Sequence, residues 1–182
     1  FKKFKISKIN YYFTIPNNPT ISKSKLKFLK KKQNDYNISI NDIEDLKKSY
    51  FIIYDNLSIK YNIKPVHNLK IFLNLVHYFK NSIDWFVYKN NDEYYAILIF
   101  FKYGNIAHCQ YSCSIKNLDK IFPLDNLIAV AINKYSKENL SLSFGRVNDN
   151  SINLINYDLA EFKRRWGGLA DPALIVEYNT LK

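Results

Sequence analysis

The sequence predicts an α/β or α+β domain with one central mixed β-sheet. Helical spacing of apolar residues comes first, an apolar strand pair follows over 94–114, and strand–helix–strand units fill the remainder. With 182 residues, 47% of them hydrophobic, the chain can bury one core of ordinary size. This composition excludes a mainly disordered chain, because disordered chains lack aromatic and aliphatic residues.

Periodicity and turn residues divide the chain into expected elements. Asn41 is expected to cap a helix, with Glu44 three residues later completing a capping box. In the first half we expect an irregular segment at 1–20, a basic helix at 22–33, a short strand at 36–40, and helices at 41–64 and 68–79. In the second half we expect strands at 83–89, 94–103, 106–114, 140–144 and 173–181, and helices at 123–138 and 156–166. We expect 21–182 to be the domain, and 1–20 to be the end of a missing N-terminal part, since the chain contains no Met.

The net charge of +11 comes almost entirely from one end of the chain. Residues 1–32 hold ten Lys and no acid, whereas the remaining 150 residues hold 17 basic and 16 acidic groups. This block is either a solubilising surface or a contact for an anionic partner such as RNA. No apolar run reaches 18 residues, so no membrane span is expected. The two Cys, at 109 and 113, are expected to be reduced thiols of a cytoplasmic protein.

A row of polar side chains on strand 106–114 is the first candidate site. Strict alternation places His108 and Gln110 on one face and Cys109 and Tyr111 on the other. A polar row on a central strand suits a face that looks into a cleft, although solvation of that face is the alternative. His108 can exchange a proton near neutral pH, and Gln110 can hold an acyl or amide group.

Two cations form the second candidate site. Arg146 follows a strand end, where open α/β sheets place ligands, and its guanidinium suits a carboxylate or phosphate. Lys163 lies on the last helix, where it is either a cation that binds a ligand or an ordinary solvent-facing side chain. The three His residues lie far apart in sequence, so no zinc site is expected. His67 follows Pro65-Val66 at a helix start, which is typical of a capping or surface residue.

Several short motifs occur together in one order. They are His108-Cys109-Gln110-Tyr111, then Phe144-Gly145-Arg146, then Asn-x-x-Leu-x-x-Phe-Lys-x-x-Trp-Gly-Gly over 156–168, with Lys64-Pro65-Val66-His67 and Ser24-Lys25-Leu26-Lys27 ahead of them. Their order resembles the GNAT-like acetyltransferase domain of the Fem-type (peptidoglycan aminoacyltransferase-like) superfamily over roughly 20–180. The sequence departs from the family pattern at Val147, where a small hydroxyl residue is usual, and at Asp158, where Gly is usual.

The resemblance implies a GNAT-like fold, with a splayed mixed sheet and a ligand cleft at its centre. It implies transfer of an acyl or aminoacyl group, from acyl-CoA (such as acetyl-CoA) or aminoacyl-tRNA, to an amine or hydroxyl acceptor. Such an acceptor would be a small molecule or a precursor in cell-wall or surface-polysaccharide biosynthesis. A second acyltransferase-like domain upstream is also expected.

We expect His108 and Gln110 to be catalytic, and Tyr111, Arg146, Asn156 and Lys163 to bind substrate, with no metal. Two other functions stay open from the sequence. The chain could be a non-catalytic partner domain, or it could bind tRNA or other RNA through its basic N-terminal block.

Overall fold

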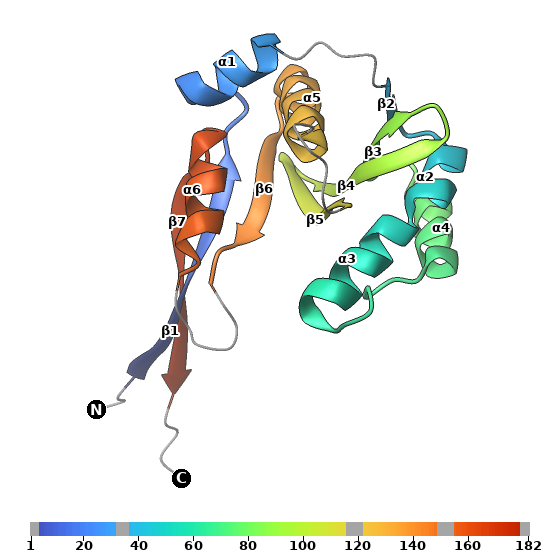
Figure 1. The fold of residues 1–182 in the computed structure, drawn as a ribbon. Coiled ribbons are helices and arrows are strands. Elements are labelled where there is room, and N and C mark those ends of the chain that lie inside the picture. The colour runs from blue at the N-terminus through green and yellow to red at the C-terminus, as the bar shows by residue number, and fades with distance from the viewer. Residues whose placement is uncertain (1–3, 32–36, 116–121, 149–154, 179–182) are drawn as a thin grey trace.

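The structure is a computed structural model, and it describes residues 4–31, 37–115, 122–148 and 155–178 (Figure 1). These residues form one seven-stranded sheet in the order β2-β3-β4-β5-β6-β1-β7. The strands are β1 (Phe4–Ile15), β2 (Asn37–Ile40), β3 (Ile83–Asn90), β4 (Glu93–Tyr103), β5 (Ile106–Ser114), β6 (Ser141–Arg146) and β7 (Leu169–Tyr178). The helices are α1 (Lys23–Lys31), α2 (Ile43–Ser49), α3 (Phe51–Tyr61), α4 (Leu69–Tyr78), α5 (Pro123–Lys137) and α6 (Tyr157–Arg165). Strands β5 and β6 pair in parallel and the other neighbours pair antiparallel, which confirms the expected mixed sheet.

Helices cover both faces of the sheet and divide its core in two. On one face, α2, α3 and α4 bury Leu46, Ile53 and Phe72 against Val87, Ile97 and Ile99. On the other face, α5 buries Leu127, Ala131 and Tyr135 against Phe86, Leu98 and Phe100. Strand β4 is therefore covered on both sides, which explains why its sequence is a continuous apolar run rather than an alternating one.

The turn between β2 and α2 differs from the expected cap. Asp42, not Asn41, is the N-cap residue, and its carboxylate accepts hydrogen bonds from the amides of Glu44 and Asp45, both at 2.9 Å. Asn41 instead adopts the left-handed conformation (φ 57°), and its Oδ1 accepts a hydrogen bond from the Trp85 amide at 2.9 Å. Asx side chains can bond either to a helix start or to a neighbouring strand, and sequence spacing alone does not separate these roles. The expected single helix also ends at Ser49, and α3 begins at Phe51.

Asp84 ties this turn to the rest of the sheet from inside the protein. Its side chain is only 2% exposed and accepts hydrogen bonds from Asn41 Nδ2 at 2.7 Å and Tyr135 Oη at 3.1 Å. The Lys102 and Lys134 ammonium groups lie 3.0 and 3.2 Å from the carboxylate. Burial alone would raise the pKa of Asp84, but the hydrogen bonds from Asn41 and Lys102 and the charges of the two lysines lower it. A buried carboxylate with this many partners stays ionised at neutral pH.

The segment 1–20 is not irregular as expected, because Phe4–Ile15 forms β1. This strand pairs with β6 on one side and β7 on the other, and it buries Phe13 and Ile15. Its partners lie more than a hundred residues away in the chain, so local sequence patterning gives little sign of them. Beyond the reach of β6, β1 and β7 continue as a pair that extends away from the other elements (Figure 1). Among the described helices, none is long and apolar enough to cross a membrane.

Gly168 is expected to be required by close packing rather than by backbone conformation. A Cβ on Gly168 would lie 2.8 Å from the carbonyl oxygen of Lys163, whereas a Cβ on Gly104, whose φ is +55°, would meet nothing within 4 Å. Gly168→Ala should therefore lower the free energy of unfolding by about 2–3 kcal/mol, and Gly104→Ala by about 1 kcal/mol from conformational strain. Urea unfolding measures both.

Asparagine separates the two causes. Asn tolerates the left-handed conformation, so Gly104→Asn should recover most of the loss seen with Gly104→Ala. Gly168→Asn should recover none, because its Cβ meets the same carbonyl. Recovery at Gly168 would contradict the packing explanation.

Candidate functional site

Strands β5 and β6 separate part-way along their length. They pair from Ile106 with Ser141 to His108 with Ser143, and no pairing follows, although β5 continues to Ser114 and β6 to Arg146. Beyond His108 the two strands therefore diverge, as the splayed sheet implied by the resemblance requires. Beyond this point the groups of β5 on the side of β6 lack a strand partner and can face a ligand.

A β-bulge at Gln110 changes the faces expected for β5. Phe100 of β4 is opposite Cys109 and Ile99 is opposite Tyr111, so Gln110 is an extra residue on β5. Cys109 therefore packs on the α5 face and Tyr111 on the face covered by α2, α3 and α4. His108 is opposite Phe101, which packs on that same second face. The expectation that Tyr111 and His108 lie on opposite faces is wrong, because the bulge shifts the alternation by one residue.

His108 is half-buried at the point where the strands separate. Its Nδ1 lies 3.1 Å from the Ser143 hydroxyl, and its Cε1 lies 3.7 Å from where a Cβ on Gly145 would be. Burial lowers the pKa of His108, and the nearby Lys163 ammonium lowers it further. The imidazole is therefore neutral at pH 7 and can accept a proton.

Lys163 extends from α6 into the end of β6. The residue is 4% exposed, and its ammonium donates hydrogen bonds to the carbonyls of Phe144, Gly145 and Arg146 at 2.6, 3.1 and 3.0 Å. Burial lowers the pKa of Lys163 to about 8, so the amine remains mostly charged at neutral pH. The solvent-facing alternative for this residue is wrong.

Three consecutive carbonyls of a regular strand cannot all point at one group, because they alternate in direction. Their convergence on Lys163 requires a bend in β6, and Gly145 supplies it with a φ of +66°. Strand β1 is irregular at the same place, between Tyr12 and Thr14. The buried ammonium, the glycine and the end of the β5–β6 pairing are thus parts of one local arrangement.

A second histidine, His67, lies beside this arrangement, although the sequence favoured a capping or surface residue at this position. Its Nδ1 is 3.2 Å from the Tyr111 hydroxyl, and its ring contacts Phe101, the residue opposite His108. Tyr50 fixes the loop by donating a hydrogen bond to the His67 carbonyl at 2.6 Å. The Lys64–His67 motif was the only sequence signal for this contact. His67 and Tyr111 therefore form a wall next to His108.

The other expected site residues have different environments. Arg146 is exposed, and within the described ranges its guanidinium makes no hydrogen bond or ion pair. Asn156 is exposed and caps α6, since its Oδ1 accepts a hydrogen bond from the Leu159 amide at 2.9 Å. Gln110 is half-buried in the bulge. Of the two departures from the family pattern, Val147 is buried and Asp158 lies in the first turn of α6.

A pocket of about 340 Å³ lies at the far end of β5. Ser114 and Ile115 line it from the strand, and Phe162 lines it from α6, next to Lys163. The start of α5 contributes Pro123, Leu124 and Asp125, and the Asp125 carboxylate is paired with Lys25 at 2.5 Å. The amides at a helix start attract anions. Among the residues that the structure describes, no group of three or more His, Cys, Asp or Glu is placed to hold a metal ion.

Known structures share the fold of this chain, although their sequences are only 9–12% identical to it. No family model and no curated protein matches the chain by sequence. FemX superposes with a TM-score of 0.67 at 12% identity, over 88% of this chain and 59% of FemX. L-PGS from Bacillus licheniformis gives 0.64 at 12% identity, over 97% of this chain and 61% of that protein. A GCN5-related N-acetyltransferase-like protein from Streptococcus suis 89/1591 superposes with a TM-score of 0.57 at 9% identity, over 98% of this chain and 63% of that protein.

The chain has a GNAT-like fold. The fold implied by the resemblance to Fem-type domains is thereby confirmed. The chain spans about three fifths of the length of FemX and L-PGS.

Lys163→Met should destabilise the GNAT-like sheet, and the loss should grow with pH. Three carbonyls lose their donor, so the free energy of unfolding at pH 7 should fall by about 1–3 kcal/mol. The pKa of Lys163 is about 8 in the fold against 10.5 ordinarily, so between these values the unfolded chain binds more protons. The contribution of Lys163 to the free energy of unfolding therefore rises as pH increases from 8 to 10.5. The Met variant has no such contribution, so its deficit relative to the wild type grows over this range.

Urea unfolding at pH 7, 8, 9 and 10 tests this dependence. Lys137→Met is the matched control, since Lys137 is exposed on α5 and should show no pH-dependent loss. A deficit of Lys163→Met that shrinks between pH 8 and 10 would show that the amine is not held as described.

Proposed function

We propose that the chain is an acyltransferase that moves an acyl or aminoacyl group to an amine or hydroxyl acceptor. The observation that carries this proposal is the neutral imidazole of His108 at the point where β5 and β6 diverge, beside the buried ammonium of Lys163. A proton acceptor next to a fixed positive charge suits a reaction in which an acceptor loses a proton while negative charge develops on an acyl oxygen. The fold shared with FemX and a GCN5-related N-acetyltransferase-like protein supports the same class of reaction.

The proposed step conserves atoms and charge. The acceptor nitrogen or oxygen attacks the acyl carbon, His108 takes the proton of the acceptor, and the bond between the acyl carbon and the donor breaks. The donor leaves as a thiolate or alkoxide and then takes up a proton. Gln110 and Arg146 would position the reactants, and placement of the two partners can lower the barrier by roughly 7–11 kcal/mol at best. Tyr111 and His67 would form the wall against the acceptor.

The distance between the two ends of β5 favours an elongated donor. Five residues lie between His108 and Ser114, and their partners on β4, Phe101 and Ala96, are five positions apart, which corresponds to roughly 17 Å of strand. A donor whose acyl end reaches His108 could place an anionic part in the pocket at the start of α5, where Ser114 and Pro123 lie. Acyl-CoA, such as acetyl-CoA, and the 3′ end of an aminoacyl-tRNA both combine a long arm with phosphates.

One contact favours the aminoacyl-tRNA alternative. The Ser22 amide donates a hydrogen bond to the Arg165 carbonyl at 3.0 Å, so α1 begins beside the end of α6. Lys25 packs over the rings of Phe162 and Trp166. The exposed lysines of α1, Lys23 and Lys27, are thereby held near the helix that carries Lys163. We propose that the acceptor is a small molecule or a cell-wall or sugar precursor, and that the reaction occurs in the cytoplasm, where Cys109 and Cys113 stay reduced.

His108→Ala should lower the rate of the chemical step by more than tenfold while the protein stays folded. On the acidic side the rate of the wild type should fall only below pH 6.5, because burial lowers the pKa of His108 beneath the ordinary value, and on the basic side it should fall above about pH 8, where Lys163 loses its positive charge. Single-turnover transfer from acetyl-CoA or aminoacyl-tRNA to a panel of amines measures both effects. Ser112→Ala is the control, since Ser112 is exposed on the same strand. Transfer at the wild-type rate by His108→Ala would rule out this base.

The donor should be identifiable by its effect on melting temperature. A donor that binds at 100 times its Kd should stabilise the fold by about 2.7 kcal/mol. If the donor is aminoacyl-tRNA, Lys23→Ala with Lys27→Ala should weaken its binding and reduce the salt dependence, while acetyl-CoA has no effect on melting. If the donor is acetyl-CoA, the double variant should melt with the same shift as the wild type. No shift with either donor would favour a non-catalytic partner domain.

A further inference from the structure

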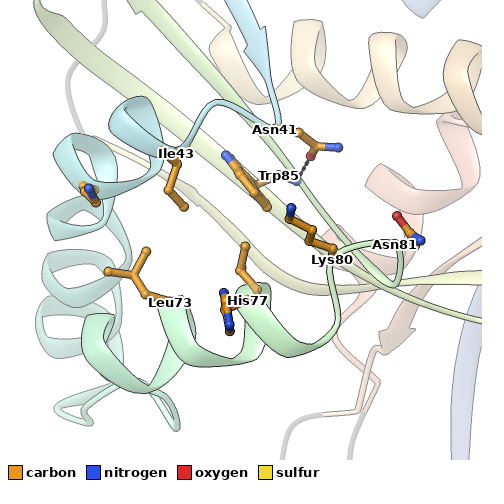
Figure 2. Close-up of a pocket in the computed structure, with 9 residues that line it drawn as sticks. Asn41, Ile43, Leu73, His77, Lys80, Asn81 and Trp85 are labelled. Carbon is orange, nitrogen blue, oxygen red and sulfur yellow. Dashed lines mark hydrogen bonds between the residues drawn. The ribbon is translucent and has the colours of Figure 1, made fainter.

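A second pocket, of about 590 Å³, lies apart from the residues assigned to acyl transfer. It is enclosed between α2 and α4 against the first residues of β3 (Figure 2). Its lining shares no residue with the site around His108 or with the pocket at the start of α5. Its volume falls within the range of small-molecule sites, roughly 300–1,000 Å³.

The floor of this pocket is fixed before any ligand binds. Trp85 is 5% exposed, and its indole N–H donates a hydrogen bond to the Asp42 carbonyl at 2.7 Å. Its amide donates to Asn41 Oδ1 at 2.9 Å, and the other side of the Asn41 amide is held by Asp84. A ligand would therefore not have to order these groups, which lowers the entropic cost of binding.

The walls combine hydrocarbon with positive charge. Ile43, Leu73 and Val76 contribute the apolar surface, from α2 and α4 (Figure 2). The lining also contains Lys80 and His77, and it contains no carboxylate.

Lys47 lines the pocket as well, but it is paired with Glu44 at 2.7 Å. Lys80 is exposed, and over the residues that the structure describes it makes no ion pair. The available charge in the pocket is thus positive.

We propose that this pocket binds an amphipathic monoanion, meaning an aromatic or branched hydrocarbon group that carries one carboxylate or sulfonate. The hydrocarbon would lie against Trp85 and Leu73, and the anionic group would face Lys80. A bare anion such as phosphate would gain nothing from the apolar walls, and a neutral hydrocarbon would leave Lys80 without a partner.

Two fluorescent probes test the charge and the hydrocarbon separately. The first is 8-anilinonaphthalene-1-sulfonate, and the second is N-phenyl-1-naphthylamine, which has the same rings without the sulfonate. The wild type should bind one sulfonated probe per chain, at least about fivefold more tightly than the neutral probe. 3-Phenylpropionate should displace it, 3-phenylpropanol should require about three- to fivefold higher concentration, and inorganic phosphate should not displace it.

Variants locate the binding. Lys80→Ala should weaken the sulfonated probe by about three- to fivefold and leave the neutral probe unchanged. Lys137→Ala is the matched control, since Lys137 is equally exposed on the opposite face of the sheet, and it should change neither. Leu73→Trp should fill the pocket and abolish binding of both probes, with circular dichroism and melting temperature confirming the fold. If Leu73→Trp does not fold, Asn81→Trp at the rim serves the same purpose, since Asn81 is exposed.

Three results would overturn the proposal. They are equal affinity of the two probes for the wild type, unchanged binding in a folded pocket-filling variant, and displacement of the sulfonated probe by inorganic phosphate. None of these results depends on acyl transfer, so the proposed function stands or falls separately.

Discussion

The buried ammonium of Lys163 is the interaction on which the candidate site depends. It holds three consecutive β6 carbonyls in an arrangement that a regular strand cannot adopt, and Gly145 provides the bend. Pairing between β5 and β6 ends just before this bend, after His108 and Ser143. The same charge also lowers the pKa of His108 and so favours its proton-accepting form. One side chain thus contributes to both the shape and the electrostatics of the opening.

Two backbone irregularities, one on each of these strands, then determine which groups meet. The bulge at Gln110 places Tyr111 on the face that also carries His108, where His67 reaches it from the loop before α4. If Gln110 were instead paired as a regular strand residue, Tyr111 would lie on the same face as Cys109, which is the face covered by α5. Bulges often redirect side chains beside functional sites, and here the redirected residue forms the wall next to the proposed base.

Local patterning in the sequence predicted most of the elements but little of this geometry. Strand β5 has the expected bounds, because alternation and the Gly104-Asn105 turn define it, and α4 begins after Asn68 as expected. Strand β1 could not be recognised in the same way, since its partners are distant in the chain. The expected helix over 156–166 contains Lys163, but its spacing could not show that the ammonium of Lys163 ends at β6. Such long-range contacts follow from the assembled sheet rather than from any segment.

The pocket between α2 and α4 and the candidate site around His108 lie on the same face of the sheet. Trp85, Ile99 and Tyr111 are directly opposite one another on β3, β4 and β5, so the floor of the pocket and the wall beside His108 are about 10 Å apart, or two strand spacings. Helix α4 spans the same interval, with His67 just before its start and His77 in its last turn. Ile99 and Phe72 are fully buried and closely packed. A ligand that moves α4 at Leu73 therefore has to move the helix relative to Trp85, Ile99 and Tyr111 together.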